Sequence, residues 1–202
     1  MITVHHLNQS RSMRVIWLLE ELGLDYEVVN HQRDPQTMLA PESLKQVHLL
    51  AKAPVVVDGN TTLCESGAVM EYLLDQAGDS KLRPAKGAAN YYHYLEWLHF
   101  AEGSLSLPVI SSLILGMEER TGDKPIDGYI VKELALDFAY IESRLAENAY
   151  FAGEEFTAAD VMMTFLLLGA KARDMLTNYP HTLSYLKQIE QRKAYLLAKS
   201  YG

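Results

Sequence analysis

The chain divides into two parts by the spacing of its apolar residues. Up to about residue 80, short β-branched runs alternate with longer stretches in which apolar residues recur every three or four positions. Beyond that point only the three-to-four-residue spacing continues. A two-residue period is typical of strands and a 3.6-residue period of helices. The pattern therefore predicts an α/β domain followed by an all-helical domain.

The first part is predicted to follow the order β-α-β-α-β-β-α. Strands are expected at 2–7, 26–29, 54–57 and 61–63, and helices at about 15–22, 41–47 and 65–76. Gly23 is placed to end the first helix, because glycine readily adopts the conformation that terminates helices. Asp58-Gly59-Asn60 is a turn sequence, so the last two strands are expected to form a hairpin.

The second part begins after a stretch without apolar periodicity, 78–87. We predict domains at 1–79 and 87–202, with a linker at 80–86. Two long helices are expected, one around 91–105 and one around 130–145. Thr157 and Asp160 have the spacing in which a hydroxyl and an acid satisfy the first amides of a helix, and we interpret both as structural.

Charge and cysteine content exclude several classes of function. The 202 residues carry a formal net charge of -8, which disfavours nucleic acid as a partner. The single cysteine, Cys64, excludes an intrachain disulfide and a Cys-rich zinc site. The start does not resemble a signal peptide, and the apolar run at 161–170 is too short to span a bilayer. We therefore expect a cytoplasmic protein with no metal and no membrane partner.

One candidate binding segment is Lys52-Ala53-Pro54, at the start of the third strand. A proline there cannot donate a hydrogen bond to the sheet and is a candidate for a cis peptide bond. Such a bond would turn the backbone of Ala53 outward, where an extended peptide ligand could pair with it. A plain strand start is the alternative interpretation.

A second candidate segment is Glu65-Ser66, where the next helix begins. The amides and the positive dipole potential of a helix start suit a carboxylate, so Ser66 could bind one. Glu65 could bind an ammonium group. The alternative is that these residues only cap the helix. Taken together, the two segments predict a site for a small peptide-like ligand.

This combination resembles the cytosolic glutathione transferases of the bacterial, serine type. The similarity covers essentially the whole chain and includes SRSMRVIWLLEELGLDYE from residue 10 and FTAADVMM near residue 160. The resemblance implies a thioredoxin-like first domain, a helical second domain and glutathione as co-substrate.

The resemblance also implies roles for the candidate residues. Glu65 and Ser66 match the pair that holds the γ-glutamyl end, Ala53 matches the residue whose backbone pairs with the cysteinyl unit, and Pro54 matches the cis-proline. Lys52 matches a position that often contacts the glycyl carboxylate. The chain departs from the common pattern at Leu49 and Ala51, where proline and glycine are usual.

In serine-type members, a hydroxyl between the first strand and the first helix donates a hydrogen bond to the glutathione sulfur. That bond stabilises the thiolate, which is the nucleophile. Ser10 and Ser12 both lie there, and Ser10 is preferred for its spacing from Arg14. Ser12 better suits the alternative role of helix N-cap. Arg11 is a candidate for positive potential near the sulfur.

The resemblance further implies an electrophile pocket in the second domain, with Phe100, Ser104 and Leu107 as candidates. The expected activity is conjugation of glutathione to a small hydrophobic electrophile by a homodimer. The alternatives are glutathione-dependent peroxide reduction and a non-catalytic glutathione-binding module.

His5 and His6 are adjacent in a strand, so they are expected to face opposite sides, one buried and one half-exposed.

Overall fold

The computed structural model describes residues 1–78 and 80–201 and divides into two compact units. The first unit comprises Met1–Leu82 together with the stretch that begins at Glu190, and the second comprises Arg83–Ile189. Residues 79 and 202, which end the two predicted domains, lie outside the described residues. The chain passes from one unit to the other between Leu82 and Arg83.

The first unit has the element order that the sequence predicts. Its elements are β1 (Ile2–Leu7), α1 (Ser12–Leu22), β2 (Tyr26–His31), α2 (Glu42–Lys45), β3 (Val55–Asp58), β4 (Thr61–Cys64) and α3 (Ser66–Ala77). Gly23 ends α1 in the left-handed conformation, with φ of 65°. Only the ends of the elements differ from the predicted ranges, which is usual because helix and strand ends are set by local hydrogen bonding.

The four strands form one mixed sheet in the order β2-β1-β3-β4. β1 is parallel to β2 and antiparallel to β3, and β3 is antiparallel to β4. Val55, the first residue of β3, pairs with His5 near the end of β1 and with Cys64 at the end of β4. The end of β1, the start of β3 and the end of β4 therefore lie at the same edge of the sheet.

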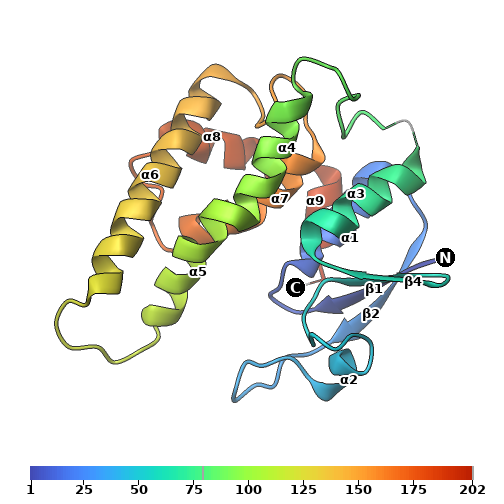
Figure 1. Cartoon of the computed structure of the whole chain (residues 1–202), viewed down its shortest axis with the longest axis horizontal. Coiled ribbons are helices and arrows are strands. Elements are labelled where there is room, and N and C mark those ends of the chain that lie inside the picture. The colour runs from blue at the N-terminus through green and yellow to red at the C-terminus, as the bar shows by residue number, and fades with distance from the viewer. Residues whose placement is uncertain (79, 202) are drawn as a thin grey trace. The chain divides into compact units, whose positions relative to one another are not determined.

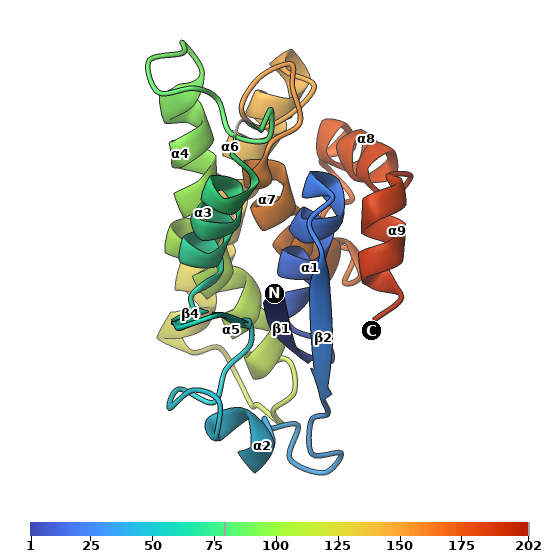
Figure 2. The ribbon, with the colours of Figure 1, turned by 90° about the vertical axis from the view of Figure 1, so that its right-hand side faces the viewer.

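The two faces of the sheet are covered by different helices. α1 and α3 lie on one side and α2 on the other, as Figures 1 and 2 both show. On the α2 side, Leu44 packs in a buried cluster with Leu7 and Val55. His6 points to the opposite side and is only 1% exposed, whereas His5 is half-buried. The predicted contrast between the two histidines is confirmed.

The last helix, α9 (Lys193–Lys199), belongs to the first unit, although the helices that precede it in sequence belong to the second. Figures 1 and 2 show it beside α1. The ring of Tyr195 meets that of Trp17 edge-on, with centroids 5.2 Å apart. The helical region of the second unit is therefore shorter than the predicted 87–202. Apolar periodicity indicates that a helix has a buried face, but not which surface covers it.

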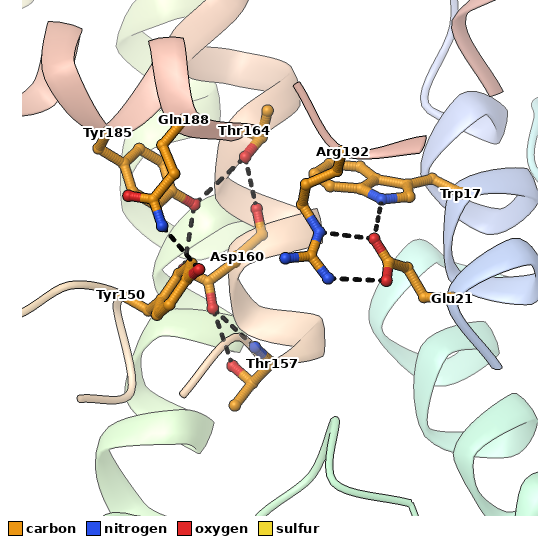
Figure 3. Close-up of polar contacts among 9 residues, drawn as sticks. All are labelled: Trp17, Glu21, Tyr150, Thr157, Asp160, Thr164, Tyr185, Gln188 and Arg192. Carbon is orange, nitrogen blue, oxygen red and sulfur yellow. Dashed lines mark hydrogen bonds and ion pairs between the residues drawn. The ribbon is translucent and has the colours of Figure 1, made fainter. Parts of the chain in front are cut away.

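An ion pair fixes this contact. Arg192 donates two hydrogen bonds to the carboxylate of Glu21, at 2.7 and 2.8 Å. The same carboxylate accepts a bond of 2.9 Å from the indole nitrogen of Trp17, so that Glu21 lies between the two residues in Figure 3. Two-point arginine–carboxylate pairs are geometrically specific, so this one sets where α9 lies on α1.

The second unit is helical, as predicted. Its helices are α4 (Tyr91–Phe100), a π-helical segment (Ala101–Leu105), α5 (Ser106–Leu115), α6 (Pro125–Glu147), α7 (Ala158–Lys171) and α8 (Pro180–Ile189). The first three run as one helix of 25 residues, in which an 18-residue window has a mean hydropathy of 1.4, so it is long and apolar enough to cross a membrane by these two criteria. Core helices of soluble proteins meet the same criteria, and Tyr94, Trp97 and Leu105 are fully buried. The absence of a membrane partner stays a prediction.

Asp160 organises the start of α7. Its carboxylate, which has no exposed surface, accepts hydrogen bonds from the backbone amides of Thr157 (2.9 Å) and Phe151 (3.0 Å) and from the hydroxyl of Tyr185 (3.0 Å). Figure 3 shows Tyr185 and Thr157 converging on it. Burial raises the pKa of Asp160 to about 6, and the hydrogen bonds oppose that shift. The predicted capping arrangement of Thr157 and Asp160 is confirmed.

We predict that Asp160→Ala lowers the free energy of unfolding by about 3 to 5 kcal/mol, because it leaves buried donors on three residues without an acceptor. Asp160→Asn retains one acceptor oxygen and should lose less. Denaturant unfolding of both variants checks this. A loss below about 1 kcal/mol for the alanine variant would show that the network is not structural.

Candidate functional site

Three chain segments meet the sheet edge at which β1 and β4 end and β3 begins. They are the loop 8–11 after β1, the approach 51–54 to β3, and the Glu65-Ser66 step between β4 and α3. The strand register brings them together although they are far apart in sequence. Most sequence-predicted residues of the first unit belong to these segments, and Ser12 follows the loop directly as the first residue of α1. Those within the segments are Ser10, Arg11, Lys52, Ala53, Pro54, Glu65 and Ser66. This edge is the candidate site.

The two candidate serines have different surroundings. Ser12 is fully buried as the first residue of α1, and its hydroxyl lies 2.9 Å from Nδ1 of His6 and 2.7 Å from the Ser10 hydroxyl. Ser10 keeps 8% of its surface exposed. The suggestion that Ser12 is the N-cap of α1 is wrong. The N-cap is Arg11, and it is the Ser10 hydroxyl that accepts a bond of 3.2 Å from the Ser12 amide.

The loop that carries Ser10 is held from β2 and the segment after it. Arg33 donates to the backbone carbonyls of Asn8 (3.1 Å) and Met38 (2.9 Å), and its own amide donates to the Asn8 side chain at 2.8 Å. Gln9, between these contacts and Ser10, has a left-handed φ of 52°. Sequence reasoning missed Arg33, because a partner so distant along the chain leaves no local pattern.

The approach to β3 has the predicted backbone. The peptide bond between Ala53 and Pro54 is cis, which confirms that prediction. Pro54 is buried, Ala53 half-buried and Lys52 exposed. Ala51 has a φ of 48°, in the left-handed region that favours glycine. Alanine thus adopts the turn for which the resembling family usually has glycine, so the loop keeps a glycine-like bend here.

Glu65 and Ser66 form the start of α3. Glu65 occupies the N-cap position with φ of 71° and ψ of 117°, and among the described residues its side chain makes no capping hydrogen bond. Ser66 is the first helical residue and is 4% exposed. The alternative that Glu65 caps the helix with its side chain is therefore wrong. The binding roles of Glu65 and Ser66 stay predictions.

The pKa values of the histidines of β1 and β2 are lowered by their surroundings. Burial lowers the pKa of His6, and the nearby His31 lowers it further, while the hydrogen bond to the Tyr201 carbonyl opposes both. Burial also lowers the pKa of His5 and of His31, whose rings share a hydrogen bond of 3.0 Å. Within residues 1–78 and 80–201 no three His, Cys, Asp or Glu side chains gather as a metal site.

The predicted electrophile-pocket residues lie on the long helix of the second unit. Phe100 ends α4 and packs in an aromatic cluster, with its ring centroid 5.1 Å from that of Trp97 and 5.7 Å from that of Tyr140. Ser104 lies in the π-helical segment, and Leu107 on α5 is 58% exposed. Their role, like that of Arg11 and Lys52, stays a prediction.

A thioredoxin-like α/β unit with a cis-proline before β3, followed by a helical unit, defines the class of this protein as a two-domain fold with a thioredoxin-like first domain. The family model of the glutathione S-transferase N-terminal domain matches residues 1–75, and that of the C-terminal domain matches residues 108–193. The chain therefore belongs to the glutathione S-transferase family.

Individual relatives agree with this assignment. Glutathione S-transferase 3 of Schizosaccharomyces pombe is 36% identical over 193 residues, which cover 90% of this chain and 78% of the relative. A glutathione S-transferase structure from Actinobacillus pleuropneumoniae is 36% identical with a TM-score of 0.87, covering 99% of this chain and 92% of that one. A glutathione transferase family member from Pseudomonas fluorescens, solved with two glutathione bound, shares the fold at 22% identity and a TM-score of 0.83, covering 98% and 91%.

Proposed function

We propose that the protein joins the thiolate of glutathione to an electrophilic carbon of a small hydrophobic substrate. The observation that carries this proposal is the meeting of three segments at one sheet edge: the loop 8–11 (the serine loop), the approach 51–54 to β3 (the cis-proline turn) and the start of α3 at Glu65-Ser66. Each supplies a different kind of group, so that binding and chemistry are divided among them. Membership of the glutathione S-transferase family supports the choice of ligand.

In this proposal the cis-proline turn and the start of α3 bind the glutathione peptide. The backbone of Ala53 pairs with the cysteinyl unit as an added strand. Ser66 and the first amides of α3 bind the γ-glutamyl carboxylate, and Glu65 binds its ammonium group. Lys52, exposed beside them, binds the glycyl carboxylate. Fixing both ends of an extended tripeptide places its central thiol at a defined point on the edge.

The serine loop supplies the chemistry. Ser10, which retains exposed surface while Ser12 has none, donates a hydrogen bond from its hydroxyl to the sulfur. A hydrogen bond to an ionised acceptor is stronger than one to a neutral acceptor, so donation favours the thiolate over the thiol. The positive end of α1 and the charge of Arg11 act in the same direction. The thiol pKa, ordinarily about 8.5, falls towards neutrality.

The electrophile is proposed to bind beside Phe100, Ser104 and Leu107. Apolar and aromatic walls with few polar groups accept many small molecules, which suits a detoxification enzyme.

The glutathione thiolate that attacks an electrophile is also competent to reduce a peroxide. Rates on a hydroperoxide and on an aryl halide, measured side by side, distinguish the two activities.

We propose from family membership that the protein is a cytoplasmic homodimer. Sedimentation should then give twice the chain mass of 22.8 kDa. A single species at 22.8 kDa, at the concentrations used for activity, would contradict the dimer.

Ser10→Ala should lower kcat/KM for a general electrophile by about 10²-fold, the typical effect of removing one donor to a developing or stabilised anion. The loss should fall mainly on kcat and should raise the apparent pKa of the bound thiol in the pH–rate profile. Steady-state kinetics between pH 5.5 and pH 9, with the range chosen to span an ordinary thiol pKa of about 8.5, check this.

Glu65→Gln is the matched control for binding. It removes the ammonium partner and should weaken glutathione binding without moving the thiol pKa of the complex. If Ser10→Ala leaves conjugation unchanged while Ser12→Ala abolishes it, the assignment of the donor is wrong. If neither substitution matters, the serine mechanism itself is wrong.

A further inference from the structure

A continuous chain of hydrogen bonds leads away from Ser10 into the interior of the first unit. The Ser10 hydroxyl lies 2.7 Å from that of Ser12, and Ser12 Oγ lies 2.9 Å from Nδ1 of His6. On the far side of the ring, Nε2 of His6 lies 3.2 Å from the backbone carbonyl of Tyr201. The site proposed for the sulfur is thus connected, through two hydroxyls, to a buried imidazole.

The direction of each bond follows from the Tyr201 carbonyl. A carbonyl only accepts, so Nε2 of His6 carries a proton, and in the neutral ring Nδ1 is then an acceptor. The hydroxyl of Ser12 donates to it at 2.9 Å, closer than the Leu7 carbonyl, which lies 3.3 Å from the same hydroxyl. Ser12 in turn accepts from the Leu7 amide at 3.2 Å and from the Ser10 hydroxyl. With the site empty, protons therefore point from Ser10 towards His6.

Binding of a thiolate reverses this order. If Ser10 turns its only proton to the sulfur, the oxygens of Ser10 and Ser12 remain 2.7 Å apart, and that distance requires a proton between them. Ser12 can supply the proton only by releasing Nδ1 of His6. The released nitrogen regains a hydrogen bond to Ser12 Oγ only if it carries a proton itself. The chain is fully bonded with a thiol and a neutral His6, or with a thiolate and a protonated His6.

One concerted shift interconverts the two arrangements. The S–H bond breaks as Ser10 gains that proton, Ser10 passes its own proton to Ser12, and Ser12 passes its own to Nδ1 of His6. Three protons move by one bond each, and both hydroxyls remain intact. No oxidant, reductant or further reactant takes part.

We propose that the proton lost by the glutathione thiol is held on His6, so that the bound thiolate is paired with a buried imidazolium. This inference rests on the proposed function, in which Ser10 contacts the sulfur. His6 does not touch the ligand; it is a positioning residue that acts through the two serines.

The surroundings of His6 suit this role. The ring is 1% exposed, so a proton on it does not pass directly to water. The Tyr201 ring lies edge-on to it with centroids 6.1 Å apart and holds its orientation. Burial and His31 on β2 lower the pKa of His6, which favours the neutral, proton-accepting ring in the absence of glutathione. The thiolate supplies the negative charge that reverses this balance.

The positive charges on α1 oppose an imidazolium. Arg11 is the N-cap of α1 and Arg14 lies in its first turn, close in sequence to Ser12. Both also favour the thiolate, so they act on the two members of the pair in opposite directions.

The decisive quantity is the number of protons released to solvent for each thiolate formed when glutathione binds. The ultraviolet absorbance of the thiolate gives the number of thiolates formed. An indicator dye in weakly buffered solution gives the number of protons released. Near pH 6.5, the ordinary pKa of imidazole, we expect the native protein to release fewer protons than it forms thiolates, because part of the protons remains on His6. A ratio of about one would overturn the proposal.

Two variants test where the retained proton resides. His6→Asn keeps an oxygen that accepts from Ser12 but cannot take up a proton, and Ser12→Ala breaks the chain while leaving His6 in place. Both should raise the ratio to about one, with fewer thiolates formed at a given pH. His5→Leu, on the opposite face of the same strand, should match the native protein. An unchanged ratio in His6→Asn would place the proton elsewhere and refute the role of His6.

A measurement on the unmodified protein guards against misfolded variants. Nitrogen NMR of the histidine side chains should show His6 protonated at Nε2 alone without glutathione and at both nitrogens with it. Retention of the neutral form in a complex that contains thiolate would contradict the inference alone. Absence of any thiolate in the native complex would instead contradict the proposed function and, with it, this inference.

Discussion

Backbone hydrogen bonds hold β3 between β1 and β4, with Val55 opposite His5 on one side and Cys64 on the other. This register brings the serine loop, the cis-proline turn and the start of α3 to one edge of the sheet. A slip of one residue would turn every side chain of a strand to the opposite face. His6 would then leave the side of Ser12, and Leu7 would leave its cluster with Leu44.

Binding and chemistry depend on this edge in different ways. In the proposed function the peptide-holding groups are mostly backbone, at Ala53 and at the first turn of α3, so strand pairing alone positions them. The proposed reactive group, the Ser10 hydroxyl, is a side chain on a loop, which needs support of its own. Arg33 supplies it from outside through the backbone of Asn8, and Ser12 supplies it from inside through hydrogen bonds to Ser10 and His6.

The sequence predicted what is encoded locally. Apolar periodicity predicted the order of the elements in the first unit, Gly23 predicted the end of α1, and Pro54 predicted the cis peptide bond, and the structure confirms all three. Contacts between distant segments left no such signal: the packing of α9 on α1, the bonds of Arg33 to the serine loop, and the link from His6 to Tyr201. The alternative that Ser12 is the N-cap was wrong because a hydroxyl near a helix start has several hydrogen-bond partners within reach, here the Leu7 amide, Ser10 and His6, and only the fold determines which it contacts.

The central claim is that the sheet edge binds glutathione with its sulfur at Ser10. A crystal structure of the glutathione complex tests it most directly, through the distances from the sulfur to the two serine hydroxyls. The account predicts the sulfur within about 3.5 Å of Ser10 Oγ, beyond that distance from Ser12 Oγ, and the γ-glutamyl carboxylate on the Ser66 amide. Glutathione bound elsewhere, or a sulfur in contact with Ser12 and not with Ser10, would contradict it.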